Sequence, residues 1–168
     1  MREFIKTPDQ IAALMEHWFL HYYGKERAFF SGNEDFTLFD LVSEGLQRGI
    51  LAQTGLAESE KPVFLLKCDN ATFILNTTHR FIRIGGSGIE SVLYSEFAQH
   101  SGYKSIRLLS KETTAAAKGI KTDGYFEEFG LRLRSGEVLY WSIPSGKPGF
   151  AFWNVTKKCE LIGRKYQP

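Results

Sequence analysis

The spacing of apolar residues predicts a long amphipathic helix near the start of the chain. Thr7-Pro8-Asp9-Gln10 has the pattern of a capping box with proline at the first helical position, and Gly24 is placed to end the helix. Between them, apolar and aromatic residues recur at helical spacing on one broad face: Ile11, Leu14, Met15, Trp18, Phe19, Tyr22 and Tyr23. A face this aromatic must be covered, either by the rest of the chain or by a partner.

A second helical stretch is predicted after Asn33, with Glu34 and Asp35 favourably placed in its first turn. Gly45 and Gly49 weaken its later part, so a break into two pieces is an alternative. The expected buried stripe is Phe36, Phe39, Leu41 or Val42, Leu46 and Ile50. Residues 1–60 are therefore expected to form a helical N-terminal segment.

After Pro62 the apolar period changes to two, which predicts a run of antiparallel strands. Seven strands are expected, at residues 63–68, 72–77, 81–84, 89–94, 103–109, 124–134 and 138–143. A long polar connection, residues 110–123, separates the fifth strand from the sixth. Phe152, Val155, Cys159 and Ile162 then return to helical spacing, with Gly163 as the expected stop. The pattern predicts an α+β protein with a second segment at residues 61–168.

Two stretches of this second segment have recognisable sequence motifs. Thr77–Ile82 reads Thr-Thr-His-Arg-Phe-Ile, and Ile89–Phe97 reads Ile-Glu-Ser-Val-Leu-Tyr-Ser-Glu-Phe. They are similar to the T-x-x-R-hydrophobic-hydrophobic and I-x-S-I-P-Y-x-E-I signatures of the bacterial pleckstrin-homology-like (PH-like) domain family. The resemblance spans residues 61–163 and implies a seven-stranded antiparallel sheet or barrel closed by a C-terminal helix. It implies little about activity.

Many eukaryotic PH domains bind phosphoinositides through a basic cluster between their first two strands. Here the corresponding turn is Cys68-Asp69-Asn70-Ala71, which has no basic residue. Phosphoinositide binding of that kind is therefore not expected.

Composition and charge place the chain among ordinary globular proteins. It has 168 residues, of which 43% are hydrophobic and 24% charged, and a net charge of +2. The charge is uneven, because residues 1–60 contain five Lys/Arg against ten Asp/Glu and the remainder contains sixteen against nine. Either the basic part attracts an anionic ligand, or the two parts complement each other within one molecule; we favour the second interpretation. The overall excess is too small to indicate a nucleic-acid binder.

Cysteine usage and the N-terminal residues indicate the cellular compartment. Its two cysteines, Cys68 and Cys159, have no metal or redox spacing, and charges occupy the first six residues where a secretory signal would become apolar. No apolar run is long enough to span a bilayer. We expect a reduced, cytoplasmic protein without a membrane span.

Candidate chemistry is sparse. His17 and His21 lie at i and i+4 on the first helix and could ligate one metal ion, which makes a metal-dependent hydrolase an alternative. The metalloprotease pattern requires Glu directly after the first His, however, and Trp18 is there instead. Gly85–Gly88 lies between two predicted strands, whereas a dinucleotide fingerprint lies between a strand and a helix. No cofactor is expected.

The basic residues of the predicted sheet are the other candidates. Arg132 and Arg134 are two residues apart on one strand, so they share a face and could grip a phosphate or carboxylate. Arg80 and Arg83 are the remaining members of this arginine set. They favour anionic lipid or phosphate-ligand binding as an alternative; the competing interpretation is a charged outer face paired with the acidic N-terminal segment.

No set of residues has the pattern of a catalytic site, so the sequence predicts a binding or scaffold module and not an enzyme. The expected ligand is a protein or peptide, held along an exposed strand edge or in the groove beside the C-terminal helix. If the aromatic face of residues 11–23 were open, it would be the surface for a homodimer or another partner.

Overall fold

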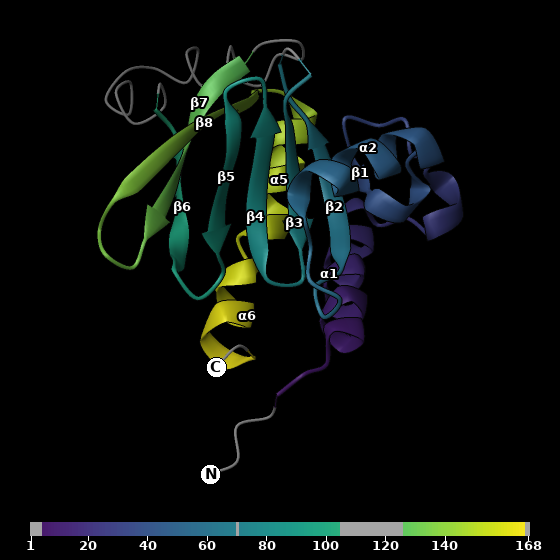
Figure 1. Ribbon diagram of the computed structural model, residues 1–168, viewed down its shortest axis with the longest axis horizontal. Coiled ribbons are helices and arrows are strands. Elements are labelled where there is room, and N and C mark those ends of the chain that lie inside the picture. Colours follow the sequence, from purple (N-terminus) through teal and green to yellow (C-terminus); the bar gives the residue numbers. More distant parts are fainter. Residues whose placement is uncertain (1–4, 70, 105–125, 167–168) are drawn as a thin grey trace.

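The computed structural model describes residues 5–69, 71–104 and 126–166, which form an α+β fold with two antiparallel sheets (Figure 1). The larger sheet has five strands in chain order: β1 (Phe36–Leu38), β2 (Pro62–Lys67), β3 (Phe73–Thr77), β4 (Arg80–Gly85) and β5 (Gly88–Leu93). The smaller sheet has three: β6 (Phe97–Tyr103), β7 (Phe126–Leu133) and β8 (Val138–Pro144). The predicted α+β class is confirmed.

In the described ranges seven strands follow residue 61, but they do not form a single sheet. The chain turns a corner after β5, where the N–H of Glu96 donates to the carbonyl of Leu93 (2.9 Å) and the N–H of Phe97 to the carbonyl of Tyr94 (3.2 Å). This corner separates β5 from β6, which pairs with β7 and with no other described strand. Among the described residues the strands therefore make two sheets and no closed barrel.

The first helix, α1 (Pro8–Tyr23), has the ends that its sequence predicts. The Thr7 hydroxyl accepts from the N–H of Gln10 (3.2 Å), and the Gln10 side chain accepts from the N–H of Thr7 (2.9 Å), so the capping box is complete. Gly24 takes the left-handed conformation (φ 62°) and ends the helix.

The predicted second helix begins too early. Phe36–Leu38 is strand β1, and Phe39–Leu41 is a single 3-10 turn, η2. Helix α2 begins only at Glu44 and ends at Thr54. The apolar residues of 36–39 satisfy a helical period, but β1 gains hydrogen-bonded pairing with β2 and buries all three of its side chains. Tertiary pairing thus overrides the local pattern.

Two further predictions for the C-terminal half differ from what the described residues show. The fifth strand was expected at 103–109, whereas β6 covers Phe97–Tyr103; residues 105–109 and the connection 110–123 lie outside the described residues. The expected single C-terminal helix is two helices, α5 (Lys147–Thr156) and α6 (Cys159–Lys165). Gly163 does not end the helix but lies inside α6, for a steric reason given below.

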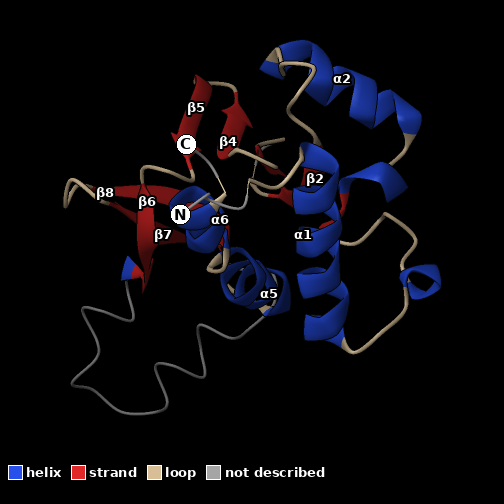
Figure 2. Ribbon diagram, turned by 90° about the horizontal axis from the view of Figure 1, so that it is seen from below, coloured by secondary structure: helices blue, strands red, loops and turns tan. Residues whose placement is uncertain are grey.

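The two faces of the five-stranded sheet carry separate apolar clusters. Helix α2 covers one face, where Ile50 packs with Leu65, Leu75 and Ile82. On the other face lie α1, α5 and the three-stranded sheet (Figure 2). Their main cluster includes Ile11, Met15, Trp18, Phe19, Phe36, Phe64, Phe81, Phe129 and Phe152.

The aromatic face of α1 is therefore largely covered within one molecule. Met15 and Phe19 are fully buried, and Trp18 is 8% exposed. Tyr22, in the last turn, remains 42% exposed. None of the helices in the described ranges combines the length and apolar character that a bilayer-spanning segment needs.

Candidate functional site

A groove lies where the end of α1 meets the start of α5. It has a volume of about 590 Å³ and is lined by Tyr22, Tyr23, Lys25, Lys147 and Phe150. We call this the α1–α5 groove. The left-handed Gly24 turns the chain out of α1, and the N–H of Lys25 donates to the carbonyl of Leu20 (3.3 Å), which places Lys25 beside the last helical turn. On the other wall, Lys147 and Phe150 come from the first turn of α5.

Aromatic packing fixes both walls of the α1–α5 groove. The Tyr23 ring lies 4.9 Å from that of Phe19 and 5.3 Å from that of Phe30, between centroids. On the opposite wall, the Phe150 ring lies 5.5 Å from that of Tyr103. Burial, and after it the neighbouring Tyr22 and Glu34, raise the pKa of Tyr23, so its phenol is neutral at physiological pH. The walls are consequently apolar and preformed.

The charged residues among the described lining of the groove are two lysines. Lys25 and Lys147 are exposed, and none of the described lining residues is a carboxylate. An apolar surface flanked by two ammonium groups complements a ligand that joins an apolar group to an anionic one.

A smaller pocket adjoins the groove around the start of α5 and shares Lys147 with it. Its volume is about 320 Å³, and Lys67, Cys68 and Phe126 are among its lining residues. Burial raises the pKa of the Cys68 thiol to about 12, which keeps the thiol protonated. Cys68 is thus poorly suited to act as a nucleophile.

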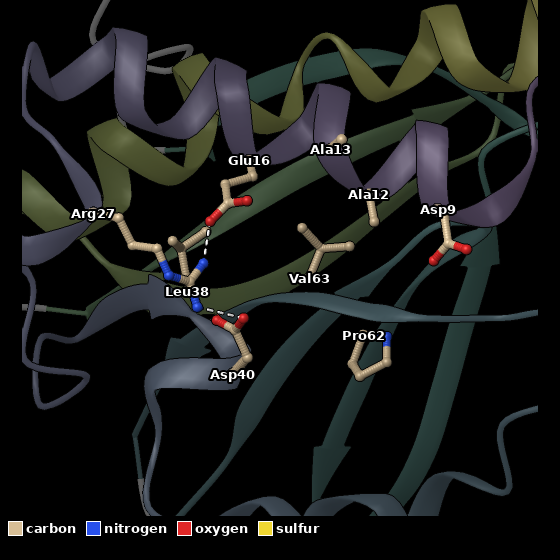
Figure 3. A pocket seen from close by; sticks show the side chains of 9 residues that line it. All are labelled: Asp9, Ala12, Ala13, Glu16, Arg27, Leu38, Asp40, Pro62 and Val63. Atoms are coloured by element: carbon tan, nitrogen blue, oxygen red, sulfur yellow. Dashed lines mark hydrogen bonds and ion pairs between the residues drawn. The ribbon is translucent and has the colours of Figure 1, made fainter.

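A third pocket, of about 260 Å³, lies between α1 and the start of β2 (Figure 3). Its Arg27 binds the carboxylates of Glu16 and Asp40, as the dashed lines show. Asp9, at its far end, pairs with Lys61. Because these charged groups satisfy one another, we assign this pocket a structural role: it ties α1 to its neighbours.

The candidate arginines have separate environments. Arg80 donates to both carboxylate oxygens of Glu60, at 2.8 and 3.3 Å, and only 7% of the Glu60 side chain is exposed. Burial alone would raise the pKa of Glu60, but the bonds from Arg80 and Thr77 outweigh it and hold that pKa below its usual value. This pair, like that of Lys61 with Asp9, joins the acidic N-terminal segment to the basic remainder of the chain.

The other three arginines are not gathered around one point either. Arg83 is on β4 with Arg80. Phe81 and Ile82, between them, belong to the clusters on opposite faces of the sheet. Because side chains alternate along a strand, Arg80 and Arg83 also project from opposite faces. Arg134 donates to the carbonyl of Ser95 (2.9 Å) and pairs with Glu160 of α6 (3.4 Å). Arg132 lies on β7, with a buried Nε that has no described partner.

The histidine pair has the expected geometry on α1. His17 and His21 are exposed, and their ring centroids are 6.0 Å apart. Within the described part of the chain, no group of three or more His, Cys, Asp or Glu residues is arranged to hold a metal ion.

Sequence reasoning identified Tyr22 and Tyr23 only as members of an aromatic face and missed Lys147 and Phe150 entirely. Pro148 in the first turn of α5 is a local signal for a helix start, but nothing local shows that this helix starts beside Gly24. Comparison with known proteins adds no assignment: the chain matches no family model, no curated protein and no solved structure.

Proposed function

We propose that the protein is a non-catalytic binding module that holds a peptide segment of a partner protein in the α1–α5 groove. The peptide carries a bulky apolar side chain next to an Asp or Glu residue. The single observation that supports this ligand is the groove itself, about 590 Å³ of mainly aromatic wall flanked by Lys25 and Lys147. Grooves of this size that bury an aromatic or aliphatic anchor are typical of peptide recognition.

The PH-like character of residues 61–163 is part of this proposal. It rests on the sequence motif at Thr77–Ile82 and on the order of seven described strands followed by C-terminal helices. We favour a peptide over a phosphate or lipid headgroup because Arg80 and Arg134 already bind carboxylates of the same chain. We favour it over metal-dependent hydrolysis because His17 and His21 lack a third described ligand.

The test is selection from a random peptide library displayed on phage, with the purified full chain as bait. We expect enriched peptides to pair an aromatic or large aliphatic residue with adjacent acidic residues. Charge reversal by Lys25→Glu should weaken binding of a synthetic consensus peptide by about tenfold, because one attractive charge becomes repulsive. Isothermal titration calorimetry measures this change, and added salt should weaken the wild-type complex.

Lys165→Glu is the matched control. Lys165 is an exposed lysine near the end of α6, so the variant has the same net charge as Lys25→Glu without altering the groove. Equal losses in the two variants would show a general charge effect and refute the groove as the binding site. Failure to enrich any consensus would refute the proposal as a whole.

A further inference from the structure

Strand β5 is the most exposed edge of the five-stranded sheet. Five of its six residues are exposed, whereas all three residues of β1, at the other edge, are buried. Among the described residues, β5 pairs with β4 and with no other strand. Ile89 (48% exposed) and Leu93 (43%) lie on the same face of β5, since each is an even number of residues from Ser91.

The register of the β4–β5 hairpin shows which backbone groups point outward. Gly85 pairs with Gly88 across a two-residue loop, and such a loop closes on a hydrogen-bonded pair. Hydrogen-bonded and non-hydrogen-bonded pairs alternate along an antiparallel ladder. Glu90 and Val92 therefore face β4, and Ile89, Ser91 and Leu93 direct their backbone groups to the open edge.

Leu93 supports this alternation independently. Its N–H donates to Glu96 Oε2 (3.4 Å) and its carbonyl accepts from the N–H of Glu96 (2.9 Å), so neither group is directed to β4. The outward groups of Ile89 and Ser91 have no such intrachain partner in the described residues.

We propose that β5 pairs antiparallel with β5 of a second copy of the chain, with the two-fold axis at Ser91. In this register Ser91 exchanges two hydrogen bonds with its symmetry mate, and Ile89 lies opposite Leu93 of the other copy. Glu90 then lies opposite Val92. A register centred one residue earlier would place the two Glu90 carboxylates opposite each other, and like charges in that position are destabilising.

The interface is short, so the dimer forms at high protein concentration. Each copy contributes one six-residue strand, and the backbone N–H and carbonyl of Leu93 are already hydrogen-bonded to Glu96. Sedimentation velocity from about 10 µM to about 1 mM should show a monomer–dimer equilibrium. Ile89→Lys should weaken dimerisation by about tenfold or more, because it places a charge against Leu93. The matched control is Phe29→Lys, at a residue that is 72% exposed and lies on no strand; it should leave the equilibrium unchanged.

Cysteine cross-linking tests the register itself. In a Cys68→Ser background, Ser91→Cys should give a covalent dimer with oxidised glutathione, since a hydrogen-bonded pair has a Cα separation of about 5.5 Å and a disulfide needs roughly 4.4–6.8 Å. Ile89→Cys should cross-link poorly, because its partner is Leu93. Stronger cross-linking through Ile89→Cys than through Ser91→Cys would overturn the proposed register.

A chain that stays monomeric throughout the concentration range would overturn the interface. The interface is independent of the α1–α5 groove, so Lys25→Glu should leave dimerisation intact and Ile89→Lys should leave peptide binding intact. Loss of peptide binding in Ile89→Lys would instead place the peptide, and not a second copy, at the β5 edge, and would also refute the dimer.

Discussion

His100 is a titratable residue in an aromatic surrounding. Its ring contacts those of Phe81, Phe97, Phe129 and Phe152, at centroid distances between 4.7 and 5.8 Å. The Thr156 hydroxyl donates to the carbonyl of Phe152 (2.6 Å), so it accepts from His100 Nε2 (2.8 Å) and assigns the proton to that nitrogen. Nδ1 is buried without a described partner, although the side chain as a whole keeps partial exposure.

This environment predicts a loss of stability in mild acid. Burial, and after it the nearby Lys157, lower the pKa of His100 to about 3. Below about pH 6.5 His100 is protonated in the unfolded chain but not in the folded chain. Its contribution to the free energy of unfolding is therefore fully present above that pH and is lost as the pH decreases toward 3. Between pH 7 and pH 5 we expect a loss of about 2 kcal/mol from this residue. Urea unfolding at the two pH values measures it.

The variant His100→Phe isolates the contribution of the histidine. It keeps an aromatic ring among the four phenylalanines and removes the titrating group. Its free energy of unfolding should change less between pH 7 and pH 5 than that of the wild type, by the same amount of about 2 kcal/mol. An unchanged difference between the two pH values would show that His100 is protonated in the folded protein.

At the scale of elements, the C-terminal half depends on close approaches that leave no room for a side chain. A Cβ on Gly163, inside α6, would lie 2.0 Å from the carbonyl oxygen of Tyr94, at the corner between the two sheets. The local sequence pattern predicts a helix stop at Gly163, and this prediction is wrong. The role of Gly163 is instead to let α6 pack directly on the backbone at that corner, which is a tertiary requirement with no local signal.

Two glycine-to-alanine variants separate the steric effect of an added Cβ from its effect on helix propensity. Gly163→Ala should destabilise the protein by about 3 kcal/mol, because the backbone of Tyr94 must move. Gly49→Ala, in α2, should stabilise it by about 0.5–1 kcal/mol, since nothing lies within 4 Å of the added Cβ and alanine is the better helix former. Thermal unfolding of both variants measures these changes. Equal effects would show that α6 does not pack on this corner.

At the scale of the whole molecule, α1 is part of the main apolar cluster. The Phe19 ring meets those of Phe36 (5.3 Å) and Phe64 (5.7 Å), and all three side chains are buried. The ion pairs of Lys61 with Asp9 and of Arg80 with Glu60 link the acidic and basic parts of the chain, in agreement with the favoured interpretation of its uneven charge.

Removal of the Phe19 ring should therefore weaken the entire fold. We expect Phe19→Ala to cost about 3–5 kcal/mol, through lost burial and the cavity that remains. Phe29→Ala is the matched control: that residue is 72% exposed, and the change should stay within about 0.5 kcal/mol. Urea unfolding followed by near- and far-ultraviolet circular dichroism measures both. If the near-ultraviolet signal of Phe19→Ala were lost in a separate, earlier transition, α1 would be energetically independent of the sheets.

The sequence by itself determined the features whose causes are local. The capping box at Thr7, the left-handed stop at Gly24 and the strand that begins at Pro62 each depend on a few neighbouring residues, and each prediction is confirmed. Burial of Ile50 on α2 also followed from spacing alone.

Only the tertiary structure decided the features that depend on distant partners. Phe36 is in a strand because Leu66 lies opposite it, and β5 and β6 separate because the chain turns at Glu96. The α1–α5 groove joins residues more than 120 positions apart, so no local pattern predicts it. Spacing along the chain encodes which faces are apolar, whereas the pairing of those faces follows from packing that the whole chain must satisfy at once.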